Sequence, residues 1–323
     1  MPNQSEPANS VDAMKHAKRR CATFVAALLV LAAALASPQG GMAAGREDAG
    51  KKSTPVSMRK PVLDSWFGNT PAIDGVLTPG EWKDATEIQG VKDWTPEFLP
   101  VRSSRDLSLR GWVKHDAEYL YFAFLITDDV LYGIDTPRWL PKENAKAHEL
   151  SREGFPWFGD EMEILLNAPN RWSGDEGVDG DGASWQMVCN LTKSRLGGIG
   201  SGGLLEGEPR TSEAAWKTYQ RWIQDGSQRA AARIKPGGKG YVIEWAIRFN
   251  PCVVLAPGRF YSPSQGQMKV GLNSAVGDID TPEKGLGQFG NFHHEQWWAG
   301  APHTRTQKNN FGTLRLMGDQ RKR

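Results

Sequence analysis

A strict alternation of side chains along residues 240–249 is the feature that most restricts how this chain folds. Every odd-numbered position there is large and apolar: Tyr241, Ile243, Trp245, Ile247 and Phe249. Glu244 and Arg248 are among the even-numbered positions. Successive side chains of a β-strand point to opposite faces, so the pattern predicts a strand with one buried face. A glycine-rich turn at 236–240 precedes it, which predicts a β-hairpin with residues 230–234.

Further segments of strand character follow one another along the chain. They are residues 109–114, 119–127, 162–167, 184–192, 268–275 and 311–316. The segment 119–127 is apolar on both faces, which is typical of a central strand. Because no regular helices separate these segments, a parallel sheet is disfavoured. The chain also holds 36 Gly, 20 Pro and 13 Trp, a composition typical of short strands joined by turns. We therefore expect an all-β fold, an antiparallel β-sandwich.

Short helices are expected only in the loops. Thr78, Pro79 and Glu81 form a capping-box pattern with proline at the first helical position, which predicts a short helix through Trp82. Residues 211–224 fit a helix or a strand, because their aromatic side chains suit both.

The N-terminal residues are predicted to direct export. A basic segment at 14–20 precedes an apolar run at 21–36, which is shorter than the roughly 20 residues of a membrane span. The run ends in the small-x-small pattern Ala34-Leu35-Ala36 that a signal peptidase cleaves. We expect residues 1–36 to be a signal peptide, with translation starting at Met14, and the protein to be secreted or periplasmic. An uncleaved N-terminal anchor is the alternative.

The rest of the chain is predicted to form one domain. Residues 37–60 are small, polar and lysine-rich, as in a flexible linker. The folded domain is expected at 61–317, followed by a basic tail at 318–323. Residues 1–36 hold four basic and two acidic residues of totals of 39 and 37, so the remainder carries 35 of each. This neutral body argues against nucleic acid or an anionic membrane as a partner.

Two cysteines remain after removal of the signal peptide, Cys189 and Cys252. In an exported protein they could form a disulfide. Cys189 also lies on the apolar side of an alternating stretch, where a free buried thiol packs well. Neither cysteine has a zinc-ligand spacing.

Five segments, in order, resemble carbohydrate-binding modules of family 9, within the wider set of DOMON-like β-sandwiches. They are residues 71–77 with Glu81 and Trp82, residues 119–129, residues 157–164, residues 241–244 with 270–273 and Asp278, and residues 311–316. The resemblance spans roughly residues 61–317 and implies a DOMON-like sandwich of immunoglobulin-like or jelly-roll-like type. It implies an exported glycan-binding protein that supports polysaccharide breakdown, with an oligosaccharide or polysaccharide as ligand and glycoside hydrolases as partners.

The resemblance also implies site residues. Trp157 occupies the position of a tryptophan that stacks on the sugar, and Glu163 the position of a glutamate that binds its hydroxyls. Stacking on the C–H face of a pyranose beside a carboxylate is chemically suited to this task. The family's sugar-contacting arginine is replaced by Gln186, and its second stacking tryptophan is absent near 301–307. His303 and Arg305 are the candidates for a lid in its place.

A structural calcium ion is the cofactor that the resemblance implies. Asp128 and Asp160 match acidic positions used for calcium in some members, and oxygen ligands at strand ends suit that ion. Further acidic candidates are Asp129, Asp278 and Asp280. The acidic loop 175–182 lacks the EF-hand spacing and is expected to be a solvated hairpin loop. The pair His293-His294 is expected at the surface.

Two other functions stay open. Glu161 and Glu163 are two residues apart on a predicted strand, so their Cα atoms would lie about 6.7 Å apart on one face. That spacing is compatible with a glycoside hydrolase. A haem-binding redox subunit is the other alternative, with Met162 and His303 as ligands. The sequence contains no HExxH, GxSxG, GxGxxG or P-loop pattern that would assign a catalytic or nucleotide site.

Overall fold

The computed structural model describes residues 60–89, 91–93, 101–132, 159–167, 184–191, 195–200, 219–256, 259–262, 268–280, 294–299 and 311–318. Within these ranges the chain is mostly β-structure. The strands are β1 (Val62–Phe67), β2 (Thr86–Ile88), β3 (Lys92–Asp93), β4 (Leu107–His115), β5 (Tyr119–Asp128), β6 (Glu161–Asn167), β7 (Ser184–Asn190), β8 (Arg195–Gly200), β9 (Gln228–Ile234), β10 (Tyr241–Arg248), β11 (Val254–Ala256), β12 (Arg259–Phe260), β13 (Met268–Asp278), β14 (His294–Trp297) and β15 (Gly312–Leu316). A one-turn helix, α4 (Phe249–Cys252), follows β10.

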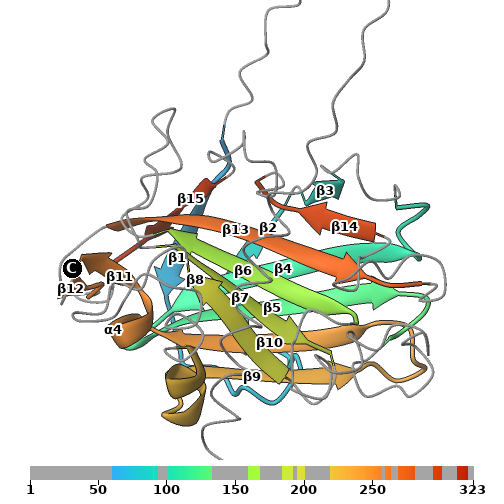
Figure 1. Ribbon diagram of the computed structural model, residues 1–323, viewed down its shortest axis with the longest axis horizontal. Helices are drawn as coiled ribbons and strands as arrows, with labels where there is room; N and C mark the ends of the chain where they lie inside the picture. Colours follow the sequence, from blue (N-terminus) through green and yellow to red (C-terminus); the bar gives the residue numbers. More distant parts are fainter. Residues whose placement is uncertain are drawn as a thin grey trace, which may run out of the picture. The chain divides into compact units, whose positions relative to one another are not determined.

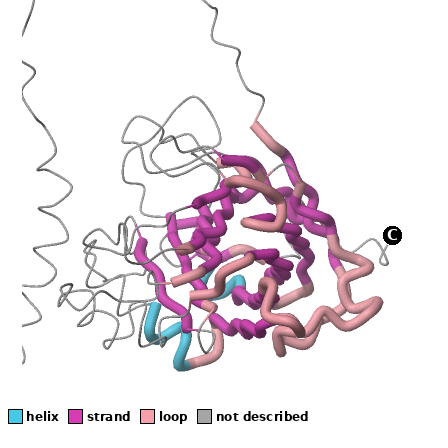
Figure 2. Tube along the Cα trace, turned by 90° about the vertical axis from the view of Figure 1, so that its right-hand side faces the viewer, coloured by secondary structure: helices cyan, strands magenta, loops and turns pink. Residues whose placement is uncertain are grey.

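Thirteen of these strands form two sheets that share β1, and β11 and β12 pair with each other in a small separate sheet. Sheet A has the order β8-β7-β6-β13-β15-β1, and sheet B has the order β1-β4-β5-β10-β9. In sheet A, β14 also pairs with β13 and carries β3, while β2 pairs with β4 in sheet B. Figure 1 shows the long strands of both sheets, and Figure 2, turned by 90°, shows them nearly end-on around the interior. The predicted β-sandwich is confirmed.

Strand β1 is the exception to the predicted antiparallel pairing. Its first half, Val62–Ser65, pairs in parallel with β15, and Trp66 and Phe67 pair in parallel with β4. One strand therefore hydrogen-bonds to both sheets and closes the sandwich along one side. The sequence did not predict β1, because a six-residue stretch with Asp and Ser in the middle carries no clear alternation.

The hairpin and the central strand are confirmed. Strands β9 and β10 pair antiparallel, with Tyr241 opposite Ile234, and β5 lies between β4 and β10. The odd-numbered side chains of β10 lie in the main core between the sheets. Sheet A contributes alternate residues of β6, β7 and β13 to the same core, among them Ile164 and Met187. Each large apolar side chain buried in this way stabilises the fold by roughly 1.5–3 kcal/mol.

The helix predicted through Trp82 is wrong. The segment from Pro79 to Asp84 forms consecutive turns, with Glu81 N bonded to Thr78 O at 3.1 Å. Two features prevent a helix. Gly80 has a φ of +87°, outside the helical region. The Glu81 carboxylate accepts a hydrogen bond from Ala72 N at 2.6 Å instead of closing the capping box. In the ambiguous segment 211–224, residues 219–224 are helical.

Both cysteines are free thiols. Cys189 and Cys252 are buried, and both belong to the main apolar core. Burial raises the pKa of each thiol well above its ordinary value, so both stay protonated and pack as small apolar groups. Of the two readings of the cysteines, the structure therefore shows the packed thiols and not the disulfide.

Candidate functional site

Strands β6 and β7 place two of the predicted sugar-site residues, Glu163 and Gln186, on the face of sheet A that points away from the main core. Met162, Ile164 and Leu166 point inward into the main core. Glu161 and Glu163 alternate with them and share the opposite face. The neighbouring strands supply the other side chains of this face. Strand β7 pairs with one edge of β6 and β13 with the other, and the register of each pair fixes which of their side chains point the same way as Glu161 and Glu163.

Gln186 and Glu163 form a pair on this outward face. Gln186 lies opposite Leu165 on β7, and its Nε2 donates a hydrogen bond of 2.9 Å to Glu163 Oε2. Glu163 is only 2% exposed, whereas Gln186 is half-buried. The donated N–H fixes the orientation of the amide, and its oxygen and second N–H remain as an acceptor and a donor. Gln186 is thus the more accessible member of the pair.

Three of the predicted site residues lie outside the described ranges. They are Trp157, His303 and Arg305. Their predicted roles in stacking and in a lid therefore stay predictions. The acidic loop 175–182 and His293 also lie outside the described residues.

Glu161 lies beside Glu163 and is fully buried. Neither of its carboxyl oxygens has a hydrogen-bond partner. Burial raises the pKa of Glu161 well above its ordinary value, and the nearby charge of Glu163 raises it further. Both effects favour the neutral, protonated form of this side chain. Both carboxyl groups are almost fully buried, whereas a hydrolytic pair must flank a glycosidic bond, so the geometry adds nothing to the hydrolase alternative.

Met162 was the proposed haem ligand on β6. Its side chain is 0% exposed and belongs to the main apolar core between the sheets. It therefore packs as a core residue, and the structure adds nothing to the haem alternative.

A second group of acidic side chains gathers at the ends of three strands. Asp128 ends β5, Asp160 immediately precedes β6, and Asp278 ends β13. One carboxylate oxygen from each lies within 4.8 Å of the others, and all three residues are buried. Both oxygens of Asp278 and one oxygen of Asp128 have no hydrogen-bond partner. Asp160 accepts hydrogen bonds from Tyr132 N at 2.6 Å and Ile279 N at 3.1 Å, which hold it in place.

The protonation of these three aspartates follows from their burial. Burial, together with the charges of the neighbouring carboxylates, raises the pKa of Asp128 to about 7 and that of Asp278 to about 10. Burial and the charges of Asp128 and Asp278 also raise the pKa of Asp160 well above its ordinary value. Three buried carboxylates at this separation repel one another unless protons or a cation compensate them. Three buried carboxylates, two of which carry unpartnered oxygens, are the donor set that a hard divalent cation such as Ca²⁺ prefers, so the residues fit the predicted ion.

The prediction that His294 lies at the surface is wrong. His294 begins β14 opposite Asp278 and is only 2% exposed. Its Nε2 lies 3.3 Å from Asp280 Oδ2 and 3.8 Å from Asp106 Oδ2. Sequence reasoning missed Asp106 and His294, because positions 106, 280 and 294 are brought together only by strand pairing and carry no local spacing signal.

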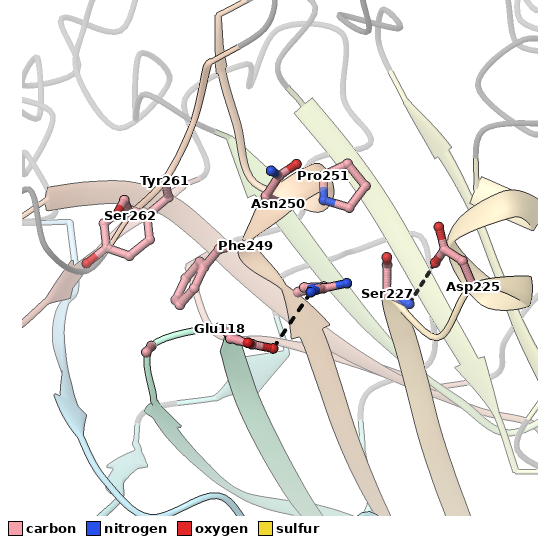
Figure 3. A pocket seen from close by; sticks show the side chains of 10 residues that line it. Glu118, Asp225, Ser227, Phe249, Asn250, Pro251, Tyr261 and Ser262 are labelled. Carbon is pink, nitrogen blue, oxygen red and sulfur yellow. Dashed lines mark hydrogen bonds and ion pairs between the residues drawn. The ribbon is translucent and has the colours of Figure 1, made fainter.

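A separate polar pocket opens near the start of β5 and the end of β10. It encloses about 380 Å³ and is lined mainly by polar side chains: Glu118, Asp225, Ser227, Arg248, Asn250 and Ser262, with Phe249, Pro251 and Tyr261. Figure 3 shows Glu118 paired with a guanidinium across the pocket, an ion pair of 3.8 Å with Arg248. No predicted site residue is among those that line it.

Comparisons with known proteins find similarity at the level of structure only. No protein-family model matches the chain, and no curated protein matches it. Among solved structures, the chain is similar to a carbohydrate-binding module of family 9 from Caldicellulosiruptor kristjanssonii in complex with cellotriose. The two share 13% identity with a TM-score of 0.48, over 80% of this chain and 95% of that chain. A family 9 module from the same organism in complex with glucose gives 12% identity and a TM-score of 0.47, over 80% and 97% of the two chains.

Among the described residues, no helix is long and apolar enough to cross a membrane.

Proposed function

We propose that this chain binds an oligosaccharide or polysaccharide on the outward face of β6 and β7. The observation that supports the proposal is the hydrogen bond from Gln186 to Glu163, which holds one amide on this face in a fixed orientation. Sugar binding needs such oriented polar groups next to a flat apolar surface. Trp157, two residues before the first described residue of this region, is the predicted stacking surface. Glu163 orients Gln186, and Gln186 meets the sugar hydroxyls.

The test of this proposal is a binding measurement on the full chain. Cellotriose and glucose are the first probes, followed by a glycan array, with calorimetric titration of every hit. Trp157→Ala should weaken binding at least about tenfold, which corresponds to about 1.4 kcal/mol. The matched control is Trp66→Ala, because Trp66 is 36% exposed on β1, outside the proposed site. Equal affinities for wild type and Trp157→Ala would remove the stacking role.

A second substitution tests the polar half of the site. Gln186→Ala should weaken binding about fivefold to thirtyfold, since one or two hydrogen bonds to hydroxyls contribute about 1 kcal/mol each. Circular dichroism of the variant checks that β7 is intact. The same samples, incubated with end-labelled oligosaccharides, report turnover. Release of shorter products would point to a hydrolase and away from a binding protein.

We also propose that Asp128, Asp160 and Asp278 hold a structural calcium ion. The support is the pair of unpartnered, buried oxygens on Asp278 next to two further buried carboxylates. The ion would neutralise these charges and tie the ends of β5 and β13 to the start of β6.

We also propose that the protein is exported. The basic, apolar and small-residue segments of residues 14–36 support a cleaved signal peptide. N-terminal sequencing of the mature protein tests it, and a chain that retains Met1 or Met14 would contradict cleavage. In the exported setting, glycan binding would support polysaccharide breakdown by partner glycoside hydrolases.

A further inference from the structure

We propose that Asp106, Asp280 and His294 form a second metal site, which binds a divalent transition metal ion such as Zn²⁺ and differs in chemistry from the proposed calcium site. The three side chains come from separate parts of the chain. Asp106 immediately precedes β4, Asp280 lies two residues beyond β13, and His294 begins β14. One ligand atom from each lies within 4.8 Å of the other two.

The distances between these ligand atoms fit a metal site. In a tetrahedral zinc site with bonds of about 2.0–2.1 Å, neighbouring ligand atoms are separated by about 3.3 Å. His294 Nε2 lies 3.3 Å from Asp280 Oδ2 and 3.8 Å from Asp106 Oδ2. A cation between these atoms therefore needs only a small adjustment of the side chains.

Burial supports a ligand at this position. Asp106, Asp280 and His294 are 3%, 8% and 2% exposed. Asp280 Oδ1 is a buried oxygen without a hydrogen-bond partner. An unpartnered oxygen on a side chain that is more than nine-tenths buried is costly unless a ligand compensates it.

The imidazole decides which metal the site takes. Calcium prefers an all-oxygen shell, and the group of Asp128, Asp160 and Asp278 supplies one. An imidazole nitrogen with carboxylates suits Zn²⁺ and the neighbouring transition metals instead. The two groups are adjacent, since Asp280 also lies within 4.8 Å of Asp128 and Asp129 at the level of ligand atoms. The two adjacent sites would therefore bind different kinds of cation, because their donor atoms differ.

Arg102 occupies the outer side of this second site. Its guanidinium contacts Asp280 Oδ2 and lies 3.0 Å from Asp106 Oδ1, while its side chain is 67% exposed. The guanidinium thus compensates the two carboxylates without a metal. Because the side chain is exposed, it can move into solvent when a metal ion binds. Arg102 is therefore a competitor of the metal and not a ligand.

The test uses the full chain, freed of metal and titrated with Zn²⁺ by calorimetry and with Co²⁺ by visible absorption. Wild type should bind one Co²⁺ with the intense d–d bands of a site of low coordination number. His294→Gln should lose these bands and weaken Zn²⁺ binding at least about 100-fold, because loss of an outer-shell partner alone costs about 10–100-fold. His293→Gln, the neighbouring histidine, is the control and should bind as wild type does.

Two further variants separate the sites and guard against misfolding. Asp160 is a ligand only of the proposed calcium site, so Asp160→Asn should leave the Co²⁺ spectrum intact. Arg102→Ala changes an exposed side chain and should strengthen Zn²⁺ binding severalfold, because it removes the competing charge. A Co²⁺ spectrum that survives His294→Gln, or Zn²⁺ binding that is absent from both wild type and Arg102→Ala, would overturn the proposal and leave His294 as a hydrogen-bonding residue between two aspartates.

Discussion

At the scale of single residues, Glu244 holds a long N-terminal segment against sheet B. Its carboxylate accepts hydrogen bonds from Asp74 N at 3.0 Å, Gly75 N at 2.9 Å and Trp82 Nε1 at 2.9 Å. Trp82 packs in a small apolar cluster on the same face with Tyr121, Ala123 and Ala246. The segments 71–82 and 241–244, which resemble a known family in sequence, are thus physically joined by one buried carboxylate.

Glu244→Gln is expected to destabilise the protein by about 2 kcal/mol, because an amide cannot accept all three hydrogen bonds and leaves a buried donor unpaired. The free energy of unfolding, from chemical denaturation, measures this. The matched control is Glu87→Gln, which removes an exposed ion pair of 3.0 Å with Arg110 and should cost less than about 1 kcal/mol. Similar losses for both variants would show that Glu244 has no special role.

At the scale of elements, the β9–β10 hairpin depends on one glycine. Gly240 has a φ of +97°, and a Cβ there would lie 2.1 Å from the Ile126 backbone oxygen on β5. The turn therefore packs directly against the third strand of the sheet. Gly237, in the same turn, also has a positive φ of +87°, but a Cβ on it would meet nothing within 4 Å.

Gly240→Ala should therefore destabilise the protein far more than Gly237→Ala. Gly237→Ala should lower the free energy of unfolding by about 1–2 kcal/mol, the cost of the left-handed conformation alone. Gly240→Ala has the same cost and must also displace the backbone of Ile126, so we expect it to lower the free energy of unfolding by more than about 3 kcal/mol. Thermal and chemical unfolding of the two variants measure the difference, and equal losses would contradict the packing argument.

At the scale of the whole molecule, His115 lies where β1 joins the two sheets. Its Nδ1 is 2.8 Å from Ser65 Oγ on β1, and its ring contacts Phe67 and Phe249 edge-on. Burial lowers the pKa of His115 from 6.5 to about 4. The folded protein thus keeps this imidazole neutral in a place where a charge would oppose the closure of the sandwich.

Acid should weaken the fold through His115. The unfolded chain takes up this proton below a pH of about 6.5, while the folded chain resists until about pH 4. The stabilisation is therefore complete above pH 6.5 and is lost as the pH falls to 4, on the order of 3 kcal/mol. The free energy of unfolding of wild type and His115→Asn, measured from pH 7.5 to 4, checks this. The difference between the two proteins should shrink across this window, and a constant difference would contradict the assignment.

Calcium removal is a second perturbation of the whole molecule, because Asp128, Asp160 and Asp278 belong to both sheets. A chelator should lower the melting temperature, and added Ca²⁺ should restore it. An ion at 100 times its dissociation constant stabilises the native state by about 2.7 kcal/mol. Asp278→Asn should abolish the response to Ca²⁺. A melting temperature that changes neither with the chelator nor with added Ca²⁺ would contradict the calcium proposal.

Most strands could be predicted from the sequence, since alternation along β10 or uniform apolarity along β5 is a local property of neighbouring residues. Several short or glycine-rich strands could not, among them β1, β3 and β14, because their strand character comes from pairing with a partner distant in the chain. The candidate site divides in the same way. Glu163 and Gln186 were placed by their resemblance to a known pattern, whereas their hydrogen bond depends on the register of β6 and β7.

The sequence by itself determined the class of fold. The period of the apolar residues shows that the segments are strands with a buried face, and strands of that kind stack into a sandwich. Only the tertiary structure decided that β1 pairs in parallel with both sheets and that Asp106, Asp280 and His294 meet. The physical reason is that strand pairing joins residues as far apart in the chain as Val62 and Thr313, so neither the parallel contact nor the cluster leaves a trace in local spacing.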